Sequence, residues 1–352
     1  MSRAHRKNEH IYHSLKKRMS RADFKDISFI HNCLPNMAFN QISLETEYMG
    51  RTYRSPLFIN AVTGGSQIAS KINSALSEVA RVCNIPMAVG SQMAALEDSS
   101  STGSFTIARK KNPGGEVWAN LGTYASPEMA ARAVNMINAD ALQIHMNVSQ
   151  ELVMKGGDRD FRDMSKRIKE IVKNIEVPVI AKEVGFGIAR EQAEALLEAG
   201  VMAIDIGGRG GTNFIAIEGS RSGRYIPESL LEWGIPTAIS LVETAEAVKD
   251  RVDIFASGGM NNALDIARAL SLGAKAVGLA AMPLNILVNY GRRTLIKKIY
   301  NLENELKLIM MMTGSGSIAD LQKAPLVVTG FTAEWLERRG INPDNYARRS
   351  LD

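Results

Sequence analysis

Short apolar runs alternate with amphipathic stretches of helical length from Pro56 onward. The runs are rich in Val, Ile and Ala and have the length of buried strands. Strands that alternate with helices in this way form a parallel sheet with right-handed crossovers. Eight such units predict a (β/α)8 barrel, and a doubly wound open sheet is the alternative. The predicted strands are 57–60, 87–89, 117–120, 141–144, 179–182, 203–206, 254–256 and 276–279, and the predicted helices are 67–82, 127–137, 160–174, 189–199, 241–249 and 263–270.

The segments on either side of this repeat have less regular patterns. The first 55 residues contain the start of a helix at 9–19 and a hairpin that ends near Arg54. Further helices are expected after the last strand, at 295–312 and 333–339. We expect a single domain with three parts, namely an N-terminal extension that covers the active site (1–55), a barrel core (56–285) and a C-terminal helical segment (286–352).

The composition excludes several classes of protein. Hydrophobic residues make up 45% of the chain and charged residues 22%, so collagen, coiled coil and wholesale disorder are excluded. Only two cysteines are present, Cys33 and Cys83, which excludes a disulfide scaffold and a cysteine-rich metal site. No apolar run approaches the ~18 residues of a membrane helix, and no apolar segment follows the basic N-terminus as in a secretory signal. We therefore expect a cytoplasmic protein without a membrane segment.

Positive charge is concentrated near the N-terminus. The net charge is +5, from 42 basic and 37 acidic residues. Residues 1–25 contain eight Lys and Arg but only two acidic residues, whereas the remainder is nearly neutral. This distribution indicates an arm that binds an anion, and a solvated terminus is the alternative.

Small, amide or charged residues follow nearly every predicted strand, at the end where parallel barrels have their active sites. After the last three strands these residues are mostly small, at 210–212, 257–259 and 280–281. Such loops let the backbone approach an anion, and helix N-termini point N–H groups at it, so together they predict a phosphate site. A tight turn is the alternative for any one loop. The connection at 212–236 is long, and loops of that length are usually functional or partly disordered.

A lysine ends the fifth predicted strand. A barrel interior does not bury a lysine without an anionic partner. A ligand with a phosphate or a negatively charged ring edge is one candidate partner for Lys182. A salt bridge with Glu183 or Glu151 is the alternative.

The fourth predicted strand has polar side chains on its inner face. Gln143, His145 and Asn147 share that face, because side chains alternate along a strand. Gln150 and Glu151 follow just beyond the strand. A single carboxylate is typical of Mg²⁺ that is shared with a substrate diphosphate, so Glu151 is a candidate metal ligand.

These motifs together resemble type 2 isopentenyl-diphosphate isomerases, from residue 3 to about residue 340. The strand-four motif and the Arg-Lys pair near the N-terminus are specific to that family, whereas the glycine loops occur in many flavin-binding barrels. The matching motifs are Arg6-Lys7-x-x-His10, Thr63-Gly64-Gly65, Gly90-Ser91-Gln92, Gln143-x-His145-x-Asn147-x-x-Gln150-Glu151, Gly156-x-Asp158-Arg159-Asp160-Phe161, Lys182-Glu183-x-Gly185-x-Gly187 and Gly208-x-Gly210-Gly211-Thr212.

The resemblance implies a barrel that binds FMN, requires Mg²⁺ and interconverts isopentenyl and dimethylallyl diphosphate with no net redox change. It also implies NADPH as the reductant of FMN, and a homo-oligomer, either a tetramer or an octamer. By the same resemblance, FMN is bound by Val62, Thr63, Gly64, Ser91, Asn120, Lys182, Thr212, Gly258, Gly259, Ala280 and Ala281. The substrate is bound by Arg6, Lys7, His10 and Gln150, and Mg²⁺ is held by Glu151. The residues implied to be catalytic are Gln150, Lys182, His145 and Asn147.

The chemistry of this reaction is demanding. Moving a double bond requires a proton to be added at one carbon and another to be removed elsewhere, and alkenes are weak bases. No obvious carboxylate pair in the sequence serves both ends. The reduced flavin can carry protons at N1 and N5, and Lys182 is then expected to stabilise its anionic form.

Three other functions compete with this interpretation. A flavin-dependent 2-hydroxy-acid oxidase needs a histidine base beside an arginine in the late loops, and none is found. An enzyme similar to inosine-monophosphate dehydrogenase needs a cysteine after the sixth strand, and residues 207–214 contain none. A nucleic-acid-binding protein could use the basic N-terminus, but no known binding motif accompanies it. We therefore expect no nucleic-acid partner.

Overall fold

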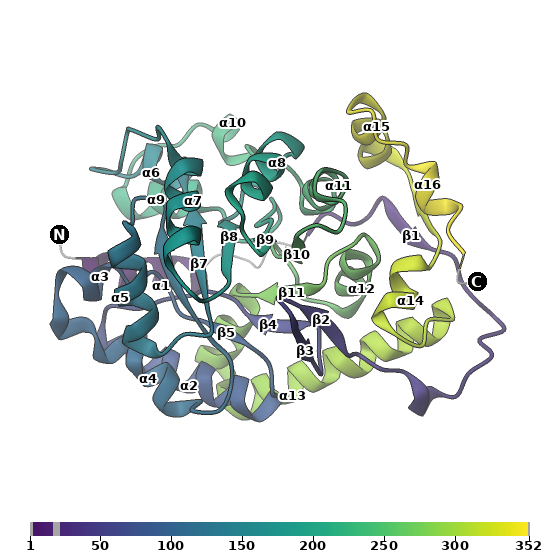
Figure 1. Ribbon diagram of the computed structural model, residues 1–352, viewed down its shortest axis with the longest axis horizontal. Coiled ribbons are helices and arrows are strands. Elements are labelled where there is room, and N and C mark those ends of the chain that lie inside the picture. Colours follow the sequence, from purple (N-terminus) through teal and green to yellow (C-terminus); the bar gives the residue numbers. More distant parts are fainter. Residues whose placement is uncertain (1–2, 17–21, 351–352) are drawn as a thin grey trace.

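The computed structural model of the protein describes residues 3–16 and 22–350. Eight parallel strands form a closed barrel at its centre, in the order β10-β11-β4-β5-β6-β7-β8-β9 (Figure 1). The ring closes because β11 pairs with β4, with Val277 opposite Leu57. The predicted barrel is confirmed, and the alternative of an open sheet is wrong. The strands are β4 (Leu57–Ile59), β5 (Met87–Ala88), β6 (Val117–Gly122), β7 (Ala141–Met146), β8 (Val179–Glu183), β9 (Ala203–Asp205), β10 (Asp253–Ala256) and β11 (Ala276–Leu279).

Helices cover the outside of the barrel (Figure 1). All six predicted crossover helices are present. The helix at 127–137 has the predicted ends, and the other five have shifted ends. One of them starts at Met164 rather than at residue 160, because Asp163 has a φ of +58° and cannot continue a helix. Another starts directly after Pro236, a residue that favours the first turn of a helix. The helices are α2 (Gln67–Cys83), α4 (Gly103–Lys111), α5 (Pro127–Ile137), α7 (Met164–Asn174), α8 (Arg190–Ala199), α11 (Thr237–Val248) and α12 (Ala263–Ser271), with short α3 (Met93–Glu97) and α6 (Val148–Val153).

Aromatic side chains fill the amino-terminal end of the barrel. Phe58, Trp118 and Phe255 are fully buried there, and the rings of Trp118 and Phe255 stack with centroids 5.9 Å apart. The predicted hairpin, β2 (Thr46–Tyr48) and β3 (Arg51–Tyr53), packs Tyr48 and Tyr53 against this cluster. The amino-terminal end of the barrel interior is therefore filled by side chains.

The long connection at 212–236 is not an open loop. It contains α9 (Phe214–Ser222) and the short α10 (Glu228–Leu231). The side chain of Asn213 caps α9 by accepting a hydrogen bond from the backbone N–H of Ala216. The N-terminal helix α1 (Arg3–Lys16) packs against α9. It includes the first part of the helix predicted at 9–19, and residues 17–19 lie outside the described residues.

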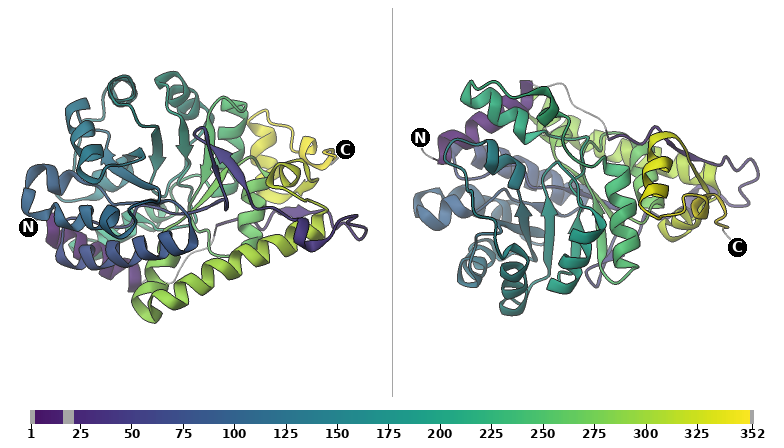
Figure 2. Two further views of the ribbon diagram at one scale, coloured as in Figure 1. Left: turned by 60° about the horizontal axis from the view of Figure 1, so that its bottom comes forward. Right: turned by 90° about the horizontal axis from the view of Figure 1, so that it is seen from above.

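The end of the chain forms a layer beside the barrel (Figure 2). The helix α13 (Ala281–Thr313) packs against α2 and α12, and a positive φ at Gly291 interrupts it. The predicted helix at 295–312 lies within α13. Farther on, β12 (Leu326–Val328) pairs antiparallel with β1 (Ile27–Phe29), which joins the two ends of the chain. The remaining helices are α14 (Ile318–Lys323), α15 (Gly330–Arg338), which overlaps the helix predicted at 333–339, and α16 (Asp344–Ala347). Among the described residues, no helix is both long and apolar enough to cross a membrane.

Candidate active site

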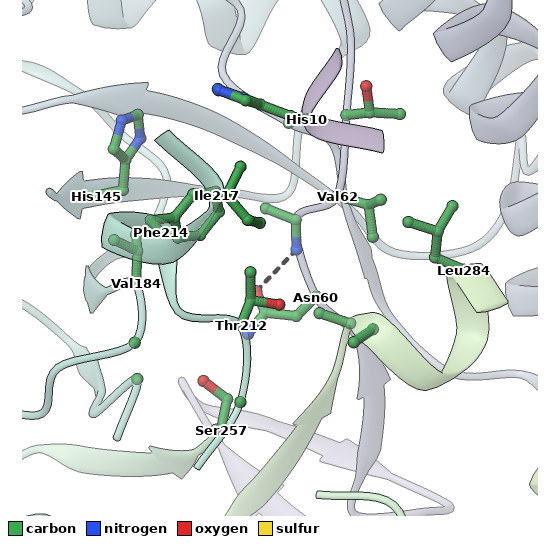
Figure 3. A pocket seen from close by; sticks show the side chains of 18 of the residues that line it. His10, Asn60, Val62, His145, Val184, Thr212, Phe214, Ile217, Ser257 and Leu284 are labelled. Carbon is green, nitrogen blue, oxygen red and sulfur yellow. Dashed lines mark hydrogen bonds between the residues drawn. The ribbon is translucent and has the colours of Figure 1, made fainter. Parts of the chain in front are cut away.

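A cavity of about 330 Å³ lies at the carboxyl-terminal ends of the barrel strands (Figure 3). Its walls come from the loops after the strands, and α1 and α9 add further residues. The volume lies within the range of small-molecule sites. The cavity is lined by these sequence-predicted residues: Lys7, His10, Val62, Thr63, Ser91, Asn120, His145, Asn147, Gln150, Glu151, Lys182, Thr212, Gly258, Gly259, Ala280 and Ala281.

Two predicted site residues are absent from this lining. Gly64 packs behind the wall, where a Cβ atom would lie 1.9 Å from Cε1 of Phe105. Its small size therefore permits close packing with α4. Arg6 belongs to α1, but its side chain lies outside the described residues.

The loops after β9 and β10 pack backbone against backbone. A Cβ atom on Gly258 would lie 2.1 Å from the carbonyl oxygen of Gly208, and one on Gly259 would lie 2.1 Å from that of Gly210. Both glycines also have positive φ angles, of 110° and 83°. Beside them, α13 begins at Ala281, which also lines the cavity. A glycine cradle at the start of a helix suits a phosphate group.

Lys182 has a buried anionic partner in the protein itself. Its Nζ lies 2.8 Å from Oδ2 of Asp205, because the register of β8 and β9 places these residues side by side. Neither of the carboxylates considered from the sequence is this partner. Glu183 instead accepts hydrogen bonds from the backbone N–H groups of Gly185 and Phe186, and burial raises its pKa to about 7 despite these bonds. The other, Glu151, accepts hydrogen bonds from within its own segment.

A row of buried amides joins Asp205 to His145 beneath the cavity floor. Asn60 donates from Nδ2 to Oδ2 of Asp205 over 2.7 Å and accepts at Oδ1 from Nε2 of Gln143 over 3.1 Å. Gln143 in turn accepts at Oε1 from Nδ2 of Asn120 over 3.0 Å. The row ends where Oδ1 of Asn120 lies 2.9 Å from Nδ1 of His145.

The direction of this row determines the state of His145. The backbone N–H of Ala61 donates to Oδ1 of Asn60, which fixes the orientation of that amide (Figure 3). Each following amide must then donate toward Asn60, so the last oxygen of the row, Oδ1 of Asn120, accepts a hydrogen bond from the Nδ1–H of His145. Burial, together with Lys7 and Lys182, lowers the pKa of His145 to about 3. The imidazole is therefore neutral, protonated on Nδ1 and able to accept a hydrogen bond at Nε2.

A second polar cluster surrounds Glu218 of α9, whose side chain is fully buried. Its Oε1 lies 2.7 Å from Nε2 of His10 on α1 and accepts from Nε2 of Gln150 over 3.0 Å. Its Oε2 lies 2.7 Å from a guanidinium nitrogen of Arg221. Burial opposes ionisation of Glu218, but the hydrogen bonds from His10, Gln150 and Arg221 outweigh it and lower the pKa to about 2. This carboxylate therefore joins α1, α6 and α9 at one edge of the cavity.

Glu151 is the only metal-ligand candidate predicted from the sequence. Its Oε1 accepts from Nδ2 of Asn147 over 2.9 Å, and its Oε2 accepts from the backbone N–H of Asp158 over 3.0 Å. In the described part of the chain, no group of three or more His, Cys, Asp and Glu side chains could hold a metal ion. A Mg²⁺ ion at Glu151 would therefore need its other ligands from a substrate and from water.

Comparison with known proteins assigns the family. The chain is 48% identical over 351 residues to isopentenyl-diphosphate delta-isomerase of Geobacillus sp. (strain WCH70), which covers 99% of this chain and 100% of that protein. It is 44% identical over 339 residues to the protein of that name from Moorella thermoacetica, with 96% and 97% coverage. The chain belongs to the isopentenyl-diphosphate delta-isomerase family. The predicted resemblance is confirmed.

Two further comparisons place this isomerase family among flavin barrels. The family model described as FMN-dependent dehydrogenase matches residues 10–145 and 142–328. A flavocytochrome b2 variant superposes with a TM-score of 0.66 at 21% identity and covers 91% of this chain and 83% of its own. A mandelate oxidase variant superposes with a TM-score of 0.64 at 17% identity, with 91% and 92% coverage. At these identities the solved structures show a shared fold, so they support the barrel and not a particular reaction.

Two buried carboxylates of this isomerase family member were missed in the sequence. Asp205 is a lone acidic residue in an otherwise apolar strand, and this isolated charge could have indicated a buried carboxylate with a cationic partner. Glu218 falls in the segment that was expected to be a long loop, and its partner His10 is 208 positions away. No local pattern marks such a contact.

Proposed function

We propose that the protein interconverts isopentenyl diphosphate and dimethylallyl diphosphate, with reduced FMN bound over the cavity floor. The observation that supports this most is the presence of two separate anion sites in one cavity. One is the glycine cradle at the start of α13, and the other contains Lys7, Gln150 and Glu151. A flavin phosphate fits the first site and a substrate diphosphate the second.

The cavity residues fit FMN. Besides the glycine cradle, the hydroxyl oxygen of Thr63 is buried and has no hydrogen-bond partner among the described residues, although this residue lines the cavity. A polar edge of a ligand would satisfy it. The residues that would hold FMN are the predicted ones that line the cavity, namely Val62, Thr63, Ser91, Asn120, Lys182, Thr212, Gly258, Gly259, Ala280 and Ala281, whereas Gly64 lies behind the cavity wall. When bound in its reduced form, FMN supplies groups that donate and accept protons beside the substrate.

The protein excludes water and orients the substrate. Ile11 of α1 and Phe214 and Ile217 of α9 line the cavity and provide an apolar wall for a five-carbon chain. Lys7 provides positive charge for the diphosphate, and Glu151 a carboxylate for Mg²⁺ shared with it. A dry site of this kind strengthens the interactions that stabilise charge during proton transfer.

The polar clusters hold the side chains that face the reacting carbons. Because Nε2 of Gln150 donates to Glu218, Oε1 of Gln150 is its accepting atom, and it accepts a long hydrogen bond of 3.4 Å from Nδ2 of Asn147. His145 is neutral and offers a lone pair at Nε2. We therefore assign Gln150, His145 and Asn147 to orientation of the substrate, and Lys182 to stabilisation of the anionic reduced flavin.

Further parts of the proposal depend on the family resemblance alone. We propose NADPH as the reductant, a tetramer or octamer as the assembly, and the cytoplasm as the location. We also propose a division into an N-terminal extension at 1–55, a barrel core at 56–285 and a helical segment at 286–352. Among the described residues of the extension, only those of α1 line the cavity, whereas the hairpin of β2 and β3 packs at the opposite end of the barrel. The position of Lys7 and His10 in the cavity wall favours a role for the basic N-terminus in substrate binding over nucleic-acid binding.

The test uses the purified full chain. We expect a yellow protein that releases FMN on denaturation, and dimethylallyl diphosphate as product from isopentenyl diphosphate only after reduction with dithionite and with Mg²⁺ present. The competing function, a 2-hydroxy-acid oxidase, predicts instead that mandelate or lactate bleaches the oxidised flavin. A colourless protein, or bleaching by a 2-hydroxy acid without isomerisation, would overturn the proposal.

A further inference from the structure

Asp205 is a fully buried carboxylate directly below the cavity floor. Its Oδ2 accepts hydrogen bonds from Nζ of Lys182 over 2.8 Å and from Nδ2 of Asn60 over 2.7 Å. Its Oδ1 accepts from Oγ of Ser257 over 2.5 Å and from the backbone N–H of Gly207 over 3.3 Å. Four donors therefore satisfy the two oxygens of this buried carboxylate. Asp205 does not line the cavity, so it cannot bind a ligand directly.

Lys182 lies between this carboxylate and the cavity. It lines the cavity and is only 8% exposed. Its ammonium group has three N–H donors, one of which is directed to Asp205, while Oγ of Ser257 is a more distant partner at 3.4 Å. The pair is electrically neutral as a whole, with its positive end toward the cavity. A ligand above Lys182 therefore experiences a compensated charge rather than a free cation.

We propose that Asp205 is a positioning residue that acts through Lys182. It holds the ammonium group at the cavity floor and offsets its charge, and so sets how strongly the site favours the anionic, reduced form of the flavin. The proposal rests on the proposed FMN-dependent function. The competing interpretation of the same contacts is that Asp205 only stabilises the barrel and has no electrostatic effect on the flavin potential.

Charge and structure can be separated with an isosteric change. Asp205→Asn keeps an oxygen that accepts from Lys182 and Asn60 and removes the negative charge, but it places an NH2 group where Oδ1 accepts from Ser257 and Gly207. Lys182 is then uncompensated and stabilises the reduced flavin anion more strongly. We expect the equilibrium constant for reduction to rise about tenfold or more, which is about 30 mV for a two-electron couple. Lys182→Met should shift the potential in the opposite direction.

The double variant provides the decisive comparison. Lys182→Met with Asp205→Asn removes both charges and restores a neutral floor, so its potential should return close to that of the unmodified protein. If the two substitutions changed the potential only by disturbing the structure, their effects would add in the double variant and would not cancel. If Lys182→Met does not fold because it leaves Asp205 without its cationic partner, Asp205→Asn and the double variant still decide the question.

The experiment is a redox titration of the FMN-loaded full chain with dithionite and a reference dye. A raised potential in Asp205→Asn and a restored potential in the double variant support the proposal. An unchanged or lowered potential in Asp205→Asn, or a double variant that differs from the unmodified protein as much as Lys182→Met does, would overturn it. If the purified protein holds no FMN, the proposed function fails before any potential is measured, so the two failures are distinguishable.

Discussion

Glu218 offers the sharpest test of how the site is held together. Replacing it with glutamine keeps the shape of the side chain but removes a charge that bonds to His10, Gln150 and Arg221. Its pKa is lowered from 4.5 to about 2 in the folded protein. At about 1.4 kcal/mol for each tenfold change in proton affinity, this is roughly 3 kcal/mol. Glutamine keeps an oxygen that still accepts a hydrogen bond, which is worth about 1 kcal/mol, so we expect a net loss of about 2 kcal/mol.

The pH dependence of this contribution has a definite sign. A depressed carboxyl pKa stabilises the folded protein above the unfolded value of 4.5, and the stabilisation is lost as the pH falls toward about 2. Glu218→Gln should therefore unfold more easily than the unmodified protein at pH 7, by about 2 kcal/mol. Over 352 residues this corresponds to a melting temperature lower by roughly 3 °C. The difference should shrink steadily as the pH is lowered from 4.5.

Urea denaturation at 25 °C across this pH range measures the effect. Glu228→Gln is the matched control, because Glu228 is an exposed carboxylate on the neighbouring α10. The control should match the unmodified protein at every pH. Equal stability of Glu218→Gln and the unmodified protein at pH 7, or a difference that does not change with pH, would refute the electrostatic account of the cluster.

Three other predictions follow from the site. Glu151→Gln should keep the flavin bound but lower isomerisation at least tenfold at saturating Mg²⁺, and near-normal activity would remove it as the metal ligand. Removal of residues 1–10 should raise the KM sharply and leave the flavin spectrum unchanged, whereas an unchanged KM would make the arm a solvated tail. Nitrogen-15 NMR of labelled protein should show His145 neutral and protonated on Nδ1 from pH 5 to 8, because its pKa lies near 3. Gln143→Met should weaken that preference, and a proton on Nε2 in the unmodified protein would contradict the directional row of amides.

The barrel was predictable from the sequence because its signal is local. Each buried strand is a short apolar run, and each crossover helix has its own amphipathic period. Errors arose where single residues decide an element's end, as at Asp163, whose left-handed backbone delays α7. The segment at 212–236 was expected to be a loop, although Asn213 caps a helix there. A capping residue of this kind can be recognised in a sequence, but it is a weaker signal for a helix than the glycines and prolines of this segment are for a loop.

The site was only partly predictable, because its partners come from distant segments. Lys182 was expected to need an anion, but its partner follows from the register of β8 against β9. Neighbours in sequence were the wrong place to look, since adjacent residues on a strand face opposite sides. Glu218 joins α1 to α9 at one edge of the cavity, and only the folded chain brings these helices together. Most residues that line the cavity were therefore predicted, whereas Asp205 and Glu218, which bond to Lys182 and Gln150, were not.

In the proposed reaction, bound FMN would have to be reduced and would undergo no net change of oxidation state. The most direct measurement follows the absorbance of the bound FMN under anaerobic conditions while isopentenyl diphosphate is converted. The account predicts that the spectrum of the reduced flavin stays constant over many turnovers as dimethylallyl diphosphate accumulates. Reoxidation of the flavin in proportion to the product formed, or isomerisation at the same rate by the oxidised protein, would contradict it.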